Sequence, residues 1–89
     1  MRKTYLEVTF RRGRPVAAYL YLRRQPGDTS CRTRKVDPGM IIDFNARDEP
    51  MGIEITAPSV VTAEGLGKVL AELDLPSLDP AELTPLRAA

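Results

Sequence analysis

The alternation of apolar and polar residues is clearest between residues 36 and 55, where two short runs each have one hydrophobic side. Side chains alternate across a strand, so residues 40–44 and 51–55 are predicted to be half-buried strands joined by a loop at residues 46–49. One register matches every apolar residue, pairing Met40 with Ile55, Ile42 with Ile53 and Phe44 with Met51. A slip by one residue would turn both apolar sides outward, so we expect this hairpin to form the centre of the core.

Three further strands are predicted before this hairpin. Residues 5–10 and 16–23 alternate apolar and polar side chains, and residues 31–36 form a more polar candidate. Turn residues separate the strands at Gly13-Arg14-Pro15, Pro26-Gly27-Asp28 and Asp37-Pro38-Gly39. Because every connection is short, we expect an antiparallel meander of four to five strands.

The apolar spacing then changes to that of a helix. A single stripe is formed by Leu66, Val69, Leu70 and Leu73. Thr62 is the predicted N-cap of this helix. Residues 79–82 resemble a capping box that begins a second short helix, which we expect to end near Pro85.

These elements predict the α+β fold class: a small antiparallel meander with one C-terminal helix packed on one face. The sheet is expected within residues 1–57, and the helix and short capped tail within residues 58–89 of the same domain. A chain of 89 residues buries only about 60 to 65% of its unfolded surface, so we expect modest stability and a tendency to self-associate.

The composition indicates the cellular compartment in which the chain is expected. No apolar run reaches the roughly 18 residues that a membrane-spanning helix needs, and we expect no contact with a membrane. The basic start of the chain already alternates like a strand, so it is interpreted as mature protein and not as a signal peptide. The single cysteine, Cys31, cannot form an internal disulfide, which suits a reducing cytoplasm.

The charge is unevenly distributed although the formal net charge is +1. Residues 1–35 contain ten Lys or Arg and two acids, whereas residues 36–89 contain three Lys or Arg and ten acids. Such asymmetry can indicate a surface for nucleic acid or an acidic partner on the basic half. The favoured interpretation is that the two halves fold against each other and neutralise their charges.

Few residues are suited to catalysis. Because the chain has no histidine, Cys31 lacks the usual base partner and is interpreted as a buried or incidental thiol. The same count excludes zinc sites built from cysteine and histidine. We therefore predict no catalytic, cofactor-binding or metal-binding residue and no cofactor.

Asp43 and Glu54 form a candidate acidic pair, because the predicted register places them diagonally on the outer face of neighbouring strands. Two carboxylates there could act in general acid–base catalysis or hold a divalent ion. The favoured interpretation is structural. A tight turn at residues 38–39 would place Arg34 opposite Asp43 in a cross-strand ion pair.

A second candidate is a nucleic-acid face that combines aromatic rings with guanidinium groups. Its candidate residues are Tyr19, Tyr21, Arg23, Arg32 and Arg34. No motif of the common RNA-binding sheets is present, and exposed tyrosines also arise from cross-strand packing. Nucleic-acid binding is therefore kept as an alternative.

Three short segments of the chain carry a resemblance to a known family: Ala17-Ala18-Tyr19-Leu20, Met40-Ile41-Ile42-Asp43 and Gly52-Ile53-Glu54-Ile55. Together they resemble a small bacterial family, the domain of unknown function 2283, over about residues 5–57. The chain departs from the family pattern at Val16, where an aspartate is usual, and at residues 46–49, where an Asp-Gly loop is usual. The resemblance implies a fold and no established activity. Some members look like partners in two-gene toxin–antitoxin-type cassettes, which implies protein binding.

We predict a non-enzymatic binding or regulatory module that binds a protein partner and forms a homodimer or other homo-oligomer. The alternatives are a nucleic-acid-binding module and, less favoured, an enzyme or metal site at Asp43 and Glu54. If the strands lie in sequence order, residues 5–10 and 51–55 are the two edges of the sheet and are available for pairing between copies.

Overall fold

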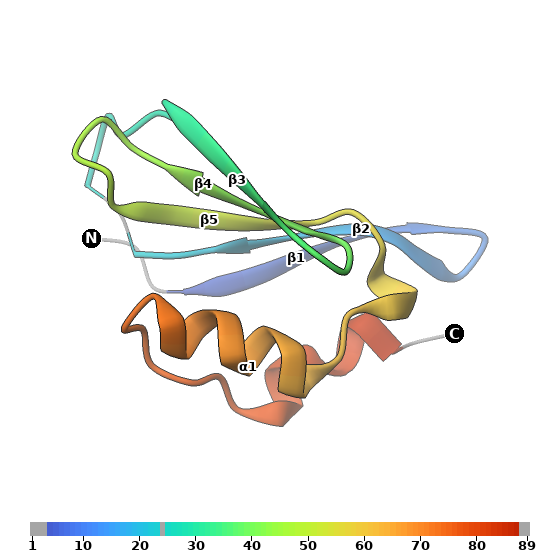
Figure 1. Cartoon of the computed structure of the whole chain (residues 1–89). Helices are drawn as coiled ribbons and strands as arrows, with labels where there is room; N and C mark the ends of the chain where they lie inside the picture. Colours follow the sequence, from blue (N-terminus) through green and yellow to red (C-terminus); the bar gives the residue numbers. More distant parts are fainter. Residues whose placement is uncertain (1–3, 24, 88–89) are drawn as a thin grey trace.

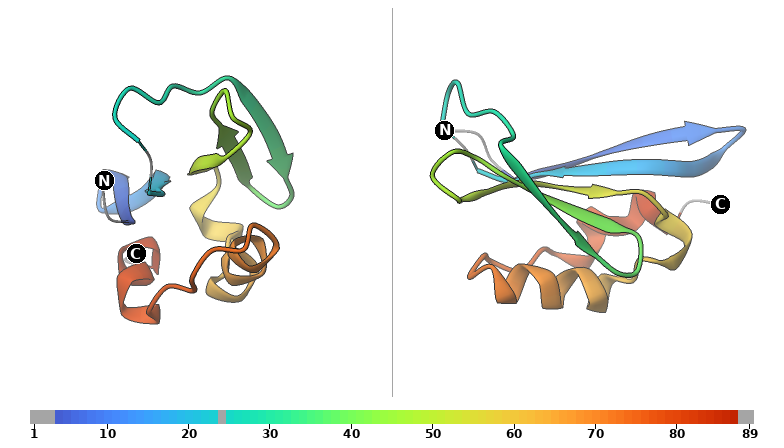
Figure 2. Two further views of the ribbon diagram at one scale, coloured as in Figure 1. Left: turned by 90° about the vertical axis from the view of Figure 1, so that its left-hand side faces the viewer. Right: turned by 45° about the horizontal axis from the view of Figure 1, so that its top comes forward.

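The computed structural model describes residues 4–23 and 25–87. Within these residues, five strands form one antiparallel sheet, which confirms the α+β fold class. The strands are β1 (Tyr5–Arg11), β2 (Arg14–Tyr21), β3 (Arg32–Val36), β4 (Met40–Phe44) and β5 (Pro50–Ile55). The chain continues through the 3-10 turn η1 (Pro58–Val60), the helix α1 (Ala63–Glu72) and the 3-10 helix η2 (Pro80–Arg87). Figures 1 and 2 show α1 and η2 on the same face of the sheet.

The order of the strands differs from the predicted meander. It is β1-β2-β5-β4-β3, so β5 lies between β2 and β4, and the edges are β1 and β3. The prediction that residues 51–55 form an edge is therefore wrong. The connection at residues 22–31 is long enough to carry the chain past the place of β5, and β5 then fills the centre with residues buried on both faces: Met51, Gly52, Ile53 and Ile55.

The central register is largely as predicted. Met40 pairs with Ile55 and Ile42 with Ile53. A β-bulge then shifts the register, so Phe44 pairs with Pro50 and not with Met51. A bulge adds one residue to one strand, and here both Phe44 and Met51 remain buried.

The core lies between the sheet and the C-terminal elements. Its fully buried side chains include Leu20, Ile42, Ile53 and Leu66. Helix α1 contributes Leu66, Val69 and Leu70, and Thr62 caps the helix by accepting a hydrogen bond from the Gly65 N–H at 2.9 Å. Apolar burial at about 25 cal/mol per Å² is the main source of stability in such a contact.

The tail covers the remainder of the apolar face. The expected capping box is present: the Ala81 N–H donates to Asp79 Oδ1 at 2.9 Å, and the Asp79 N–H donates to Glu82 Oε1 at 3.3 Å. The helix does not end near Pro85 as predicted, because η2 continues to residue 87 in 3-10 geometry. This extension buries Leu83 and Leu86 in the core.

Candidate functional site

The face of the sheet opposite α1 carries most of the polar candidate residues. Strand alternation places Tyr19 and Tyr21 of β2 on this outer face, together with Glu7 of β1, Asp43 of β4 and Glu54 of β5. None of the described helices lies on it (Figures 1 and 2). These candidate side chains are thus held on strands, while the opposite face is occupied by the core.

Three tyrosines form a continuous row on the outer face. The rings of Tyr5 and Tyr21 are stacked, with centroids 4.5 Å apart and planes 12° from parallel. Tyr19 meets Tyr21 edge to face at 4.7 Å. Both arrangements are favourable for aromatic quadrupoles, and the hydroxyl of Tyr21 also donates to Glu7 Oε1 at 3.1 Å. The row is therefore preorganised across β1 and β2.

Tyr19 also spans β5. Its hydroxyl donates to Asp43 Oδ2 at 2.6 Å, although β5 separates β2 from β4. The ring can cross only because the intervening residue is Gly52: a Cβ there would overlap the phenol. Ser30 completes the site by donating to Asp43 Oδ1 at 3.3 Å. The three residues are therefore coupled, because the hydrogen bond from Tyr19 to Asp43 requires a glycine at position 52.

Asp43 and Glu54 share the outer face in diagonal positions as predicted, but the predicted partner of Asp43 is wrong. Thr33 lies opposite Asp43, and Arg34 lies opposite Ile42. The cause is the turn between β3 and β4, which uses residues 37–39, one more than the tight turn assumed from the sequence. The extra residue moves every side chain of β3 to the other face.

The same shift divides the candidate nucleic-acid face. Arg32 and Arg34 lie on the helix-covered side, where their guanidinium carbons are 4.1 and 5.9 Å from the Phe44 ring centroid. Arg32 also donates through Nε to Asp48 Oδ1 at 2.9 Å. Tyr19 and Tyr21 are on the opposite side, so the structure does not bring these tyrosines and arginines together.

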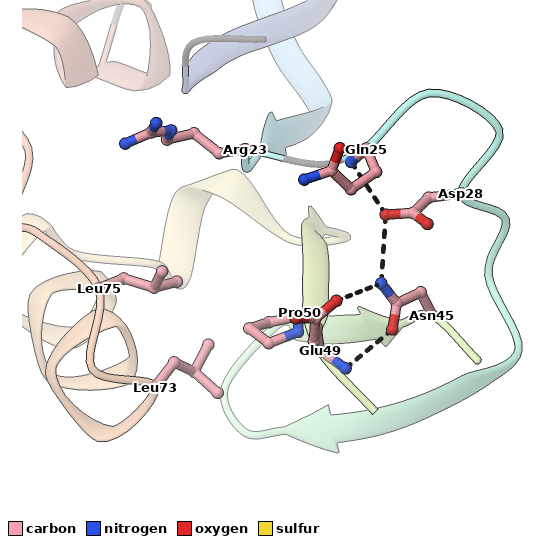
Figure 3. A pocket seen from close by; sticks show the side chains of 8 residues that line it. All are labelled: Arg23, Gln25, Asp28, Asn45, Glu49, Pro50, Leu73 and Leu75. Atoms are coloured by element: carbon pink, nitrogen blue, oxygen red, sulfur yellow. Dashed lines mark hydrogen bonds between the residues drawn. The ribbon is translucent and has the colours of Figure 1, made fainter. Parts of the chain in front are cut away.

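Arg23 contributes to a different feature, a pocket of about 260 Å³ at the end of the sheet nearest the C-terminus of α1 (Figure 3). One wall is apolar and consists of Pro50, Leu73 and Leu75. The other wall is polar and consists of Arg23, Gln25, Asp28, Asn45 and Glu49.

Asn45 organises the polar wall. It is 5% exposed, and its Nδ2 donates to Asp28 Oδ2 at 3.2 Å and to Glu49 Oε1 at 3.0 Å. Its Oδ1 accepts from the backbone N–H groups of Arg47 and Glu49, each at 2.9 Å. Figure 3 shows this chain of bonds linking the loop that contains Asp28 to the loop that contains Asn45. A buried amide whose N–H groups both donate hydrogen bonds typically holds neighbouring loops together.

The carboxyl groups of this network are held ionised. Burial alone raises the pKa of Asp28, whose side chain is 7% exposed, but hydrogen bonds from Asn45, the Gln25 N–H and Arg47 lower it by more. Hydrogen bonds from Asn45 and Arg47 likewise lower the pKa of Glu49. The bonds to Glu49 and Asp28 raise the pKa of Arg47. This network was not predicted from the sequence, although the turn-forming residues 45–48 indicate the loop in which it lies.

The remaining candidates show little grouping for chemistry. Cys31 is exposed, and its Sγ donates weakly to the Thr29 carbonyl at 3.6 Å. Among the described residues, no three His, Cys, Asp or Glu side chains are gathered so as to hold a metal ion. No helix in the described part of the chain is long and apolar enough to cross a membrane.

The comparison with protein families matches the same strands. The model of a family described as "Protein of unknown function (DUF2283)" matches residues 17–59, which contain Tyr19, Asp43 and Gly52. The chain is DUF2283-like. The match extends from β2 to η1 and leaves out β1 and α1, so it begins later than the resemblance in the sequence suggested. No curated protein and no solved structure matches the chain significantly.

Proposed function

We propose that this DUF2283-like chain is a non-enzymatic binding module whose outer sheet face binds a basic, extended segment of a partner protein. The observation that carries the proposal is the row of Tyr5, Tyr21 and Tyr19, fixed by its own stacking and by hydrogen bonds to Glu7 and Asp43. Because these rings are already ordered, binding over them costs little conformational entropy.

The residue types on this face suit a protein partner. Tyrosine is enriched among the residues that contribute most to protein interfaces, since it combines a large rigid ring with a polar end. On the outer face of the part of the sheet where β2 pairs with β5, the described charged strand residues are the acids Glu7, Asp43 and Glu54 and the single base Lys35. This acidic surplus favours arginine and lysine on the partner, which also interact with aromatic rings.

Two observations favour binding over catalysis. The chain has no histidine, and the Asp43 carboxylate is already engaged by the hydroxyl groups of Tyr19 and Ser30. A general base must reach the proton that it removes, and Asp43 would first have to release these donors. Glu54 is exposed, so its carboxylate faces water.

The test is a titration of ¹⁵N-labelled protein with an oligo-arginine peptide, followed by amide chemical shifts. We expect the largest shifts in β1, β2 and β5, and a several-fold loss of affinity in Tyr21→Ala. The matched control is Glu72→Gln on α1, which removes a carboxylate from the opposite side of the molecule and should leave the affinity unchanged. Shifts confined to residues 63–82 would refute the proposal.

A further inference from the structure

The hairpin of β1 and β2 extends beyond the rest of the sheet. Strand β5 pairs with β2 only from Ala18 to Tyr21, whereas β1 and β2 remain paired out to Arg11 and Arg14. Residues 9–17 therefore form a two-stranded arm, which projects from the sheet in Figures 1 and 2. The tip turns tightly at Arg12 and Gly13, whose φ angles are 54° and 77°.

The arm carries a concentrated positive charge. Arg11, Arg12 and Arg14 are all exposed and together line a shallow hollow beside Val16. Among the described residues, none of these three arginines has a carboxylate within 4.0 Å, whereas Arg32 and Arg47 are both ion-paired. The charge at the tip is thus not neutralised within the described chain.

Apolar side chains lie beside these arginines. Phe10 is 46% exposed and Val16 is 45% exposed, and both belong to the arm. In a duplex, an exposed apolar side chain can contact thymine methyl groups in the major groove while neighbouring guanidinium groups bind the phosphates. Residues 9–16 of the arm also lie outside the family match, which begins at residue 17.

We propose that this arm binds duplex DNA, with the guanidinium groups of Arg11, Arg12 and Arg14 on backbone phosphates. The guanidinium fork matches phosphate oxygens in two-point hydrogen bonds, and a two-stranded ribbon fits the major groove. A membrane surface fits less well, because peripheral membrane attachment typically uses an amphipathic helix with a broad apolar face. The site is separate from the outer sheet face and goes beyond the proposed function.

The proposal is tested by the salt dependence of binding to a fluorescein-labelled duplex of mixed sequence. Each phosphate contact contributes about 0.9 to the slope of log K against log salt concentration. Replacing all three arginines, as Arg11→Gln, Arg12→Asn and Arg14→Gln, should therefore make the slope shallower by about 2.7. Asparagine is chosen for Arg12 because it tolerates positive φ. The three changes to lysine should retain most of the slope.

The matched control is Arg34→Gln, an exposed arginine of β3 away from the arm, which should leave the slope unchanged. Circular dichroism and thermal melting verify that each variant folds. A triple variant with the wild-type slope, or a wild type that binds no duplex at low salt, would overturn the proposal. So would binding to phosphatidylserine vesicles without binding to DNA.

Discussion

The phenol of Tyr19 occupies the space that a side chain at Gly52 would need. This contact links β2 to β4 across β5, because the same phenol donates its proton to the Asp43 carboxylate. Glycine is ordinarily unfavourable inside a strand, where it has no side chain to pack. Here the ring covers the glycine and restores the missing contact.

Gly52→Ala should destabilise the protein by about 1 to 3 kcal/mol. The new methyl group would collide with the Tyr19 ring, and the ring would have to leave its hydrogen bond to Asp43. Urea unfolding of both proteins measures the difference in free energy. The matched control is Gly67→Ala in α1, where a methyl group meets nothing within 4 Å and should stabilise the helix by about 0.5 to 1 kcal/mol. Equal effects of the two substitutions would contradict the packing described for Tyr19.

Tyr19→Phe removes the hydroxyl and keeps the ring. We expect a loss of about 1 to 3 kcal/mol, because a half-buried carboxylate then lacks its shortest hydrogen bond. Tyr5→Phe is the control, since Tyr5 is 41% exposed and its contact with Tyr21 is through the ring alone. Thermal melts at neutral pH compare the two. A larger effect at Tyr5 would show that the hydroxyl of Tyr19 is unimportant.

The core hairpin makes a third prediction. Ile53→Ala and Phe44→Ala should each lower the free energy of unfolding by about 2 to 5 kcal/mol, because both side chains are buried in the hydrophobic core and their removal leaves a cavity. Val60→Ala, at a 48% exposed position, should change it by less than about 0.5 kcal/mol. Denaturant midpoints decide the matter, and wild-type midpoints for both core variants would contradict the register.

Alternation was sufficient to predict the pairing of Ile42 with Ile53, because burial of one face allows a single register. It was not sufficient for the order of strands, because the pairing of β2 with β5, which brings Tyr19 over Gly52, joins segments far apart in sequence. The position of Arg34 depends on one residue in a turn, and propensity does not distinguish turns of two and three residues there. The Asn45 network requires two loops to meet, so neither loop reveals it alone.

The hydrogen-bond network around Asn45 should make the free energy of unfolding depend on pH. The pKa of Asp28 is lower in the folded protein than its ordinary value, so its contribution is present at neutral pH and disappears as the pH falls below about 4. Asp28→Asn lacks this contribution at every pH. The stability difference between wild type and Asp28→Asn should therefore shrink as the pH falls from about 7 to about 3. Urea midpoints across this range measure it. A constant difference would mean that the charge of Asp28 is not what its neighbours stabilise.

We also propose that the chain forms a homodimer through the edge strand β1. Unpaired backbone groups at a sheet edge favour pairing with a second strand unless charged side chains protect them. Strand β3 is protected by Arg32, Arg34 and Lys35, whereas the seven residues of β1 include only Glu7 and Arg11 as charges. Sedimentation equilibrium across a concentration series should show a dimer, which Thr9→Lys on β1 weakens and the matched Thr33→Lys on β3 does not. A monomer mass at the highest concentration, or equal weakening by the two variants, would reject pairing through β1.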